Sequence, residues 1–179
     1  MYYAAACPSP VGTLTLVSDG TYLNGVWMEG QKYFGGSLSG TWVSRDDLPV
    51  FAETRTWLER YFAGERPLPG QLPLRPLGGA FRQLVWELLC QIPYGQVTTY
   101  GALAAEAAVR MGRASMSSQA VGGAVGHNPI SIIIPCHRVV GANGSLTGYA
   151  GGIPTKLRLL EHEGADLTRL FVPRRGTAL

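Results

Sequence analysis

Hydrophobic and polar residues alternate with a period of two near the N-terminus and follow a helical period further along the chain. Residues 12–17 alternate between apolar and polar side chains, and a β-branched and aromatic segment, 22–28, follows Asp19-Gly20. This pattern predicts a β-hairpin that turns at Asp19-Gly20. Residues 51–63 carry apolar side chains at helical spacing and stop before Gly64, so they predict a helix.

A Pro- and Gly-rich stretch, residues 67–79, separates this region from the rest of the chain. Its prolines exclude a continuous helix, which predicts a linker and a domain boundary. We therefore expect an α+β protein with two domains. Residues 1–76 form a small α/β domain, with an antiparallel sheet, a helix and the linker. Residues 77–179 form a mostly helical domain.

The second half of the chain contains three predicted helices before residue 126. Residues 81–91 are amphipathic, residues 100–108 follow the N-cap candidate Thr99, and residues 119–125 follow Ser117-Ser118. Two short helices joined by a turn are compatible with a helix-turn-helix that binds DNA. The last of these helices is rich in Gly and Ala. Its small surface indicates either close approach of another backbone or tight packing in the protein's own core.

Composition and charge narrow the class of protein. The 179 residues are 46% hydrophobic and 15% charged, which excludes a long disordered chain and favours one domain or two small ones. No apolar run is long enough to cross a membrane, and the N-terminus does not resemble a secretory signal. Three unevenly spaced cysteines favour a reducing, cytoplasmic setting without disulfides or a metal site. The basic excess lies after residue 76, with nine basic and five acidic residues, which permits a polyanionic partner.

The most informative segment is 132–140, an apolar run that leads into Pro-Cys-His-Arg. The run predicts a buried strand or extended segment, followed by functional groups at a loop. A thiol near an imidazole and a guanidinium should lose its proton more easily, which makes Cys136 a candidate nucleophile. Neighbouring side chains of an extended chain point to opposite faces, so a water would connect Cys136 with His137. Glu163 shares a helical stripe with two leucines and is the candidate that orients the imidazole.

The motif at 134–139 and its companions resemble the O6-alkylguanine-DNA alkyltransferases. The companions are Tyr100, the segments 122–124, 128–129 and 148–152, and the His-Glu-Gly at 162–164, all in the family's order. The resemblance is strong over residues 81–165 and extends to segments 9–12 and 27–32 of the N-terminal half.

The resemblance implies a single-turnover enzyme of DNA repair. It would bind double-stranded DNA as a monomer, with cooperative binding an open question, and would need no cofactor or metal. The damaged guanine would be flipped out of the helix, and its O6-alkyl group would be transferred irreversibly to Cys136. O4-alkylthymine is a second candidate substrate. The catalytic residues implied are Cys136, His137, Glu163, Asn128 and Tyr100. The substrate-binding residues implied are Tyr149, Val139, Ala150 and Arg138, with Arg138 foremost a structural residue. The DNA-binding residues implied are Ser118, Gln119, Ala120, Gly122 and Gly123.

Two features depart from the family pattern. Gln119 stands where the family usually has an arginine finger, which predicts weaker DNA binding or slower flipping. The connection 106–118 is longer than usual. The sequence leaves two alternative functions. One is a non-catalytic protein that binds alkyl lesions, which the presence of Cys136 disfavours. The other is a Cys-His hydrolase, for which no oxyanion site is evident.

Overall fold

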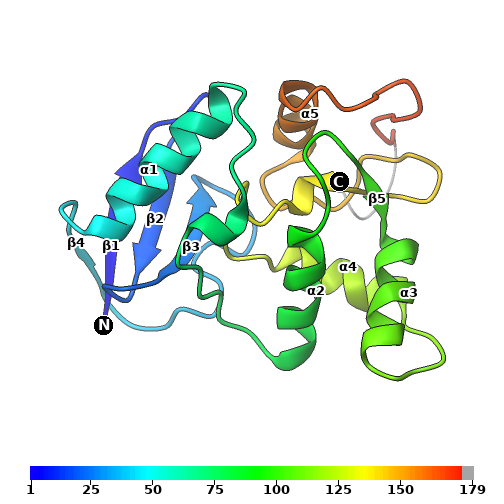
Figure 1. Ribbon diagram of the computed structural model, residues 1–179, viewed down its shortest axis with the longest axis horizontal. Coiled ribbons are helices and arrows are strands. Elements are labelled where there is room, and N and C mark those ends of the chain that lie inside the picture. The colour runs from blue at the N-terminus through cyan, green and yellow to red at the C-terminus, as the bar shows by residue number, and fades with distance from the viewer. Residues whose placement is uncertain (175–179) are drawn as a thin grey trace. The chain divides into compact units, whose positions relative to one another are not determined.

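The computed structural model describes residues 1–174, which divide into two compact units (Figure 1). The first contains residues 1–78 together with 129–134, and the second contains residues 79–128 and the described residues from Pro135 onward. The first holds a sheet with one long helix, and the second is mainly helical. The predicted α+β class is confirmed.

The first unit is built on a four-stranded sheet with the order β3-β2-β1-β4. β2 and β3 form the predicted hairpin, and Gly20 lies in its turn with φ +105°, a conformation that glycine tolerates best. β1 is antiparallel to β2, whereas β4 joins β1 in parallel. The sequence pattern predicted neither β1 nor β4. α1 contacts β2 and β3 and lies across one face of the sheet (Figure 1). The strands are β1 Tyr2–Cys7, β2 Leu14–Ser18, β3 Leu23–Met28 and β4 Trp42–Ser44, and the helix α1 is Pro49–Phe62.

The Pro- and Gly-rich stretch lies along the first unit. It contains a short 3-10 helix, η1 Pro69–Gln71. The backbone N–H of Leu23 donates to Pro73 O at 2.8 Å, and the N–H of Arg75 donates to Leu23 O at 2.8 Å. These bonds attach the stretch to β3.

The second unit contains the predicted helices with the predicted N-caps. Thr99 accepts a hydrogen bond from Ala102 N at 3.1 Å, and Ser117 accepts one from Ala120 N at 3.3 Å. α2, α3 and α4 pack against one another, and the indole of Trp86 donates to Ala124 O at 2.9 Å. The helices are α2 Ala80–Cys90, α3 Tyr100–Arg110, α4 Ser118–Gly126 and α5 Ile153–His162, with the 3-10 helix η2 Cys136–Arg138 and the paired strands β5 Thr98–Thr99 and β6 Val139–Val140.

The apolar run before the Pro-Cys-His-Arg motif is buried, as predicted, but it forms a turn, so the prediction of a strand or extended segment was wrong. Ile130 pairs with Val26 of β3, and the chain then turns, with Ile134 N donating to Ile130 O at 3.0 Å. Ile132 adopts φ +72°, which is strained for a β-branched residue. All three isoleucines of the run are almost fully buried. An unbroken apolar run indicates that the segment is buried. It has no alternating pattern from which a strand could be distinguished from a turn.

Within residues 1–174, every helix is too short or too polar to span a membrane.

Candidate active site

Cys136 is the first residue of η2 and is only 6% exposed. Burial raises the pKa of its thiol above the ordinary value, and a hydrogen bond with the Asn128 side chain acts in the opposite direction. Asn128 follows the C-terminus of α4 and is itself buried. The structure therefore brings together the predicted acceptor and the residue expected to brace it.

The imidazole of His137 is completely buried beside Glu163. Its Nε2 lies 2.6 Å from Glu163 Oε1, and its Nδ1 has no hydrogen-bond partner among the described residues. Burial lowers the pKa of His137, so the ring is neutral near pH 7. An ionised carboxylate only accepts hydrogen bonds, so the ring proton belongs on Nε2. That tautomer leaves a lone pair on Nδ1, as a general base requires.

Glu163 is the C-cap residue of α5, and its carboxylate is saturated with donors. Arg138 Nε donates to Oε2 at 2.9 Å, Arg138 Nη2 donates to Oε1 at 2.9 Å, and Gly95 N donates to Oε2 at 3.2 Å. Burial alone would raise the pKa of Glu163. The hydrogen bond from His137 and the charge of Arg138 outweigh burial and hold this pKa well below its ordinary value. Glu163 is therefore a buried carboxylate that fixes the imidazole.

Arg138 is committed to this network. Its guanidinium also donates from Nη1 to Ile92 O at 2.6 Å and lies over the Tyr94 ring, 5.7 Å from the centroid. We expected Arg138 to be mainly structural, with substrate contact as a further role. Its donors are directed at Glu163 and Ile92, so the structure supports the structural role.

The electrostatics of the thiol differ from the sequence-based expectation. The charge of Arg138 is paired with Glu163, and His137 is neutral, so neither lowers the pKa of Cys136 in this state. The positive charge that acts on Cys136 comes from Lys156 of α5.

Lys156 is fully buried and was missed by the sequence analysis. Its ammonium group donates to Thr147 O at 2.9 Å and to Val139 O, and it forms no ion pair among the described residues. Burial lowers its pKa to about 8, and the Cys136 charge acts to raise it. The only signal in the sequence was that Lys156 precedes Leu160 and Glu163 by four and seven residues, on the inward stripe of the helix.

Two tyrosines lie within electrostatic range of the sulfur. The Tyr100 hydroxyl donates to Thr147 O at 2.9 Å, and burial and the Cys136 charge raise its pKa. Tyr149 is buried, its hydroxyl has no hydrogen-bond partner among the described residues, and the same two causes raise its pKa. Thr147 O thus accepts from both Tyr100 and Lys156. The other two predicted substrate-binding residues are Val139, which is fully buried, and Ala150, which is half-buried.

The residues predicted to bind DNA lie on α4. Ser118, Gln119 and Ala120 are exposed, and an added Cβ at Gly123 would meet no atom within 4 Å. The opposite face, with Val121, Ala124 and Val125, is buried. Gly122 instead faces Tyr100, whose ring carbon Cδ1 would lie 3.7 Å from an added Cβ. The open face at Gly123 is the feature that lets another molecule approach the backbone.

Among residues 1–174, no group of three or more His, Cys, Asp or Glu side chains could hold a metal ion.

Two family models together match most of the chain. Residues 80–165 match the DNA binding domain of 6-O-methylguanine DNA methyltransferase, and residues 1–76 match its ribonuclease-like domain.

Individual methyltransferases are similar to this chain in sequence and in structure. The chain is 44% identical to a methylated-DNA–protein-cysteine methyltransferase of Haemophilus influenzae, over 90% of this chain and 86% of the relative. It is similar to the crystal structure of the O6-methylguanine methyltransferase of Mycobacterium tuberculosis, with a TM-score of 0.76 and 40% identity over 98% of this chain and 97% of the other. A structure of Mycobacterium tuberculosis OGT in complex with DNA matches with a TM-score of 0.75 and 39% identity, over 91% and 92% of the two chains.

Proposed function

The chain belongs to the 6-O-methylguanine DNA methyltransferase family and is a DNA-repair enzyme that transfers an alkyl group from DNA to a protein cysteine. On this premise we propose that Cys136 is the acceptor and that O6-alkylguanine in double-stranded DNA is the donor. The observation that carries the proposal is the buried network beside the thiol. In it, Glu163 fixes the His137 tautomer that leaves Nδ1 unprotonated.

The reaction is a single displacement. A water relays the thiol proton of Cys136 to His137 Nδ1, because that nitrogen carries a free lone pair and has no hydrogen-bond partner among the described residues. The sulfur then attacks the alkyl carbon, the S–C bond forms, and the bond from that carbon to O6 breaks. Its electron pair stays on guanine, which takes a proton from Tyr100, and Tyr100 recovers a proton from the imidazolium of His137 through water. The thioether is stable, so each chain acts once.

The exposed face of α4 supports binding in the DNA groove. Ser118, Ala120 and Gly123 present little bulk, which suits close approach to a nucleic-acid backbone. Extruding a base costs a few kcal/mol, which contacts in the groove and in the pocket offset. We assign Tyr149 to contact with the alkyl group and Tyr100 to contact with the base. We also expect the protein to act as a monomer.

Intact-mass measurement after mixing with duplex DNA that contains O6-methylguanine tests the proposal. We expect the protein to gain one methyl group in place of one hydrogen, once per chain. Cys136→Ala should gain nothing but still bind DNA, because phosphate contacts dominate affinity. Cys90→Ala is the matched control and should gain the methyl group, because it leaves Cys136 and the pair of His137 and Glu163 unchanged.

An unchanged mass of the wild-type protein would favour a non-catalytic lesion binder. Repeated product release would favour a hydrolase, and a methyl group on the Cys136→Ala variant would place the acceptor elsewhere.

A further inference from the structure

The connection between α3 and α4 begins with a fixed turn. Gly112 has φ +63°, its N–H donates to Val109 O at 3.1 Å, and Arg113 N donates to Ala108 O at 2.9 Å. These two bonds form a Schellman motif, which ends a helix and fixes the residues that follow it. The backbone of Arg113 is therefore held against the end of α3.

The side chain of Arg113 is exposed and forms no ion pair within residues 1–174. Arg110, one turn earlier on α3, differs because its Nε lies 3.1 Å from Glu106 Oε1. Of these two arginines in the same region, only Arg113 has a guanidinium without an acidic partner.

The sequence around Arg113 contains no competing acid. No Asp or Glu occurs between Glu106 and Glu161, whereas this stretch includes five basic residues. Two of the five, Arg138 and Lys156, are buried in the active site. An anion that approaches the end of α3 therefore meets a positive charge and no carboxylate from residues 107–160.

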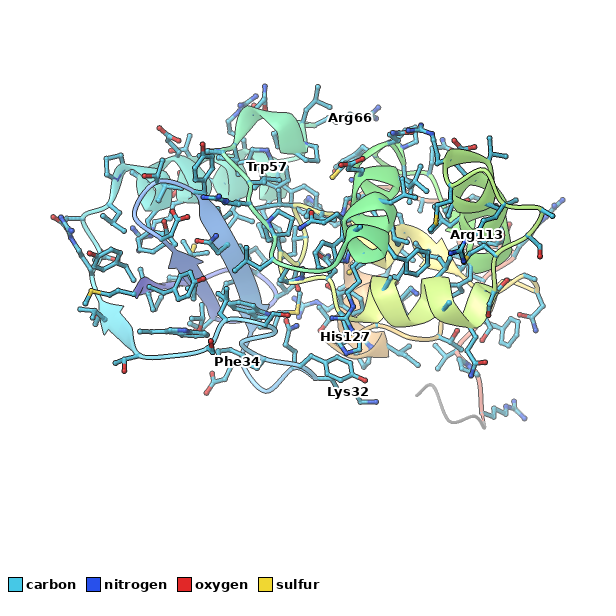
Figure 2. All side chains as sticks on the ribbon, turned by 90° about the horizontal axis from the view of Figure 1, so that it is seen from below. Lys32, Phe34, Trp57, Arg66, Arg113 and His127 are labelled. Atoms are coloured by element: carbon cyan, nitrogen blue, oxygen red, sulfur yellow. The ribbon has the colours of Figure 1, made fainter. Side chains whose placement is uncertain are left out.

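Arg113 also lies next to the proposed DNA-binding helix. Only three residues separate it from Ser117, the N-cap of α4, and α3 packs against α4. Figure 2 labels Arg113 at the turn between these helices. Ser118 and Gln119, at the start of α4, are exposed like Arg113.

We propose that Arg113 binds a phosphate of the DNA strand that flanks the groove entered by α4. The inference rests on the proposed role of α4 in DNA binding. A guanidinium matches the geometry of a phosphate with two parallel N–H donors, and it keeps its charge at any physiological pH. Gln119 brings no charge to the surface, so Arg113 supplies an electrostatic contact close to it.

The test is the salt dependence of binding to unmodified duplex DNA, measured by fluorescence anisotropy. Each phosphate contact contributes about −0.9 to the slope of log K against log salt concentration. Arg113→Gln should therefore make the slope less steep by about 0.9, so the loss of affinity between about 50 and 200 mM salt becomes roughly 3.5-fold smaller. Arg113→Lys should keep the slope, because it keeps the charge.

Arg60→Gln is the control for net charge. It removes one exposed arginine from α1, where Arg60 Nε is paired with Glu65 Oε2 at 2.6 Å. An unchanged slope for Arg113→Gln, or an equal change for Arg60→Gln, would overturn the proposal.

Intact-mass measurement of the wild-type protein after mixing with O6-methylguanine duplex DNA separates this inference from the proposed function. Absence of transfer in the wild-type protein would refute the function of Cys136, whereas the salt slopes on unmodified DNA alone decide the role of Arg113.

Discussion

Replacing Glu163 with glutamine removes the only acid of the buried network and leaves Arg138 without a counter-charge. The Glu163 side chain is 0% exposed and that of Arg138 is 9% exposed, so water screens the pair very little. Removing one partner of a buried ion pair costs about 3–5 kcal/mol. For a protein of this length, 1 kcal/mol lowers Tm by about 2–4 °C, so we expect Glu163→Gln to lower Tm by roughly 6–20 °C.

Glu163 should make the folded protein less stable as the pH falls. The pKa of Glu163 lies lower in the folded protein than in the unfolded chain, where it is about 4.3. The stabilisation is therefore complete above that value and is lost as the pH falls below it. Urea unfolding between neutral and acidic pH should show this loss in the wild-type protein and a smaller loss in Glu163→Gln.

Alkyl transfer should slow for a separate reason. The new amide can still accept the Nε2 proton of His137, so the tautomer is kept, but it brings no negative charge to stabilise the imidazolium. A neighbouring opposite charge is worth about 1–3 pKa units, so the transfer rate near neutral pH should fall about tenfold or more. Single-turnover kinetics with O6-methylguanine DNA measure this rate.

A double-mutant cycle with Arg138→Met decides whether the network acts as one unit. Residues in direct contact couple by about 0.5–3 kcal/mol, so the double variant should be less destabilised than the two single variants summed. Additive destabilisation, or a Tm of Glu163→Gln equal to that of the wild type, would refute the reasoning.

Three further predictions concern the thiol, the DNA and the pocket. Lys156→Met removes the cation near Cys136, so the pKa of the thiol should rise and transfer near neutral pH should fall about tenfold, measured by thiolate absorbance and single-turnover rates. The pKa of Lys156 is about 8, so the rate advantage of the wild-type protein over Lys156→Met should disappear as the pH rises above that value. Identical pH–rate profiles for the two proteins would contradict this. Gln119→Arg should tighten binding to duplex DNA and steepen the salt slope by about 0.9, and unchanged affinity and repair rate would contradict this. Gly148→Ala places a Cβ 2.7 Å from the Tyr100 hydroxyl at φ +76°, so it should slow transfer and lower the free energy of unfolding by about 1–3 kcal/mol. Equal rates and stability for this variant would mean that the loop at Gly148 moves freely.

The helices and their caps were predictable because their signals are local. Thr99 and Ser117 each satisfy a backbone N–H group three residues away, and the apolar stripes of 81–91 and 100–108 need no tertiary information. Glu163 was also predictable, since an acid on an apolar stripe requires a partner.

The buried turn at 130–134 and the role of Lys156 were not predictable in the same way. The turn depends on pairing with Val26, more than one hundred residues earlier in the chain. The burial of Lys156 depends on carbonyls of Val139 and Thr147, and their orientation is set by β6 and the loop that follows it. A sequence pattern can mark a lysine as inward-facing, but it cannot supply the acceptors that make its burial tolerable.

The charges of the site explain how a thiol with a raised pKa can serve as the proposed acceptor. In the resting site Arg138 and Glu163 compensate each other, His137 is neutral, and Lys156 is a buried cation without an acidic partner among the described residues. Moving the thiol proton to His137 creates a thiolate that interacts with Lys156 and an imidazolium beside Glu163. The net charge of the site stays the same, and each new ion has an opposite charge nearby in a region of low dielectric. Cys136 therefore rests as a thiol because burial raises its pKa, and its thiolate forms together with the imidazolium of His137.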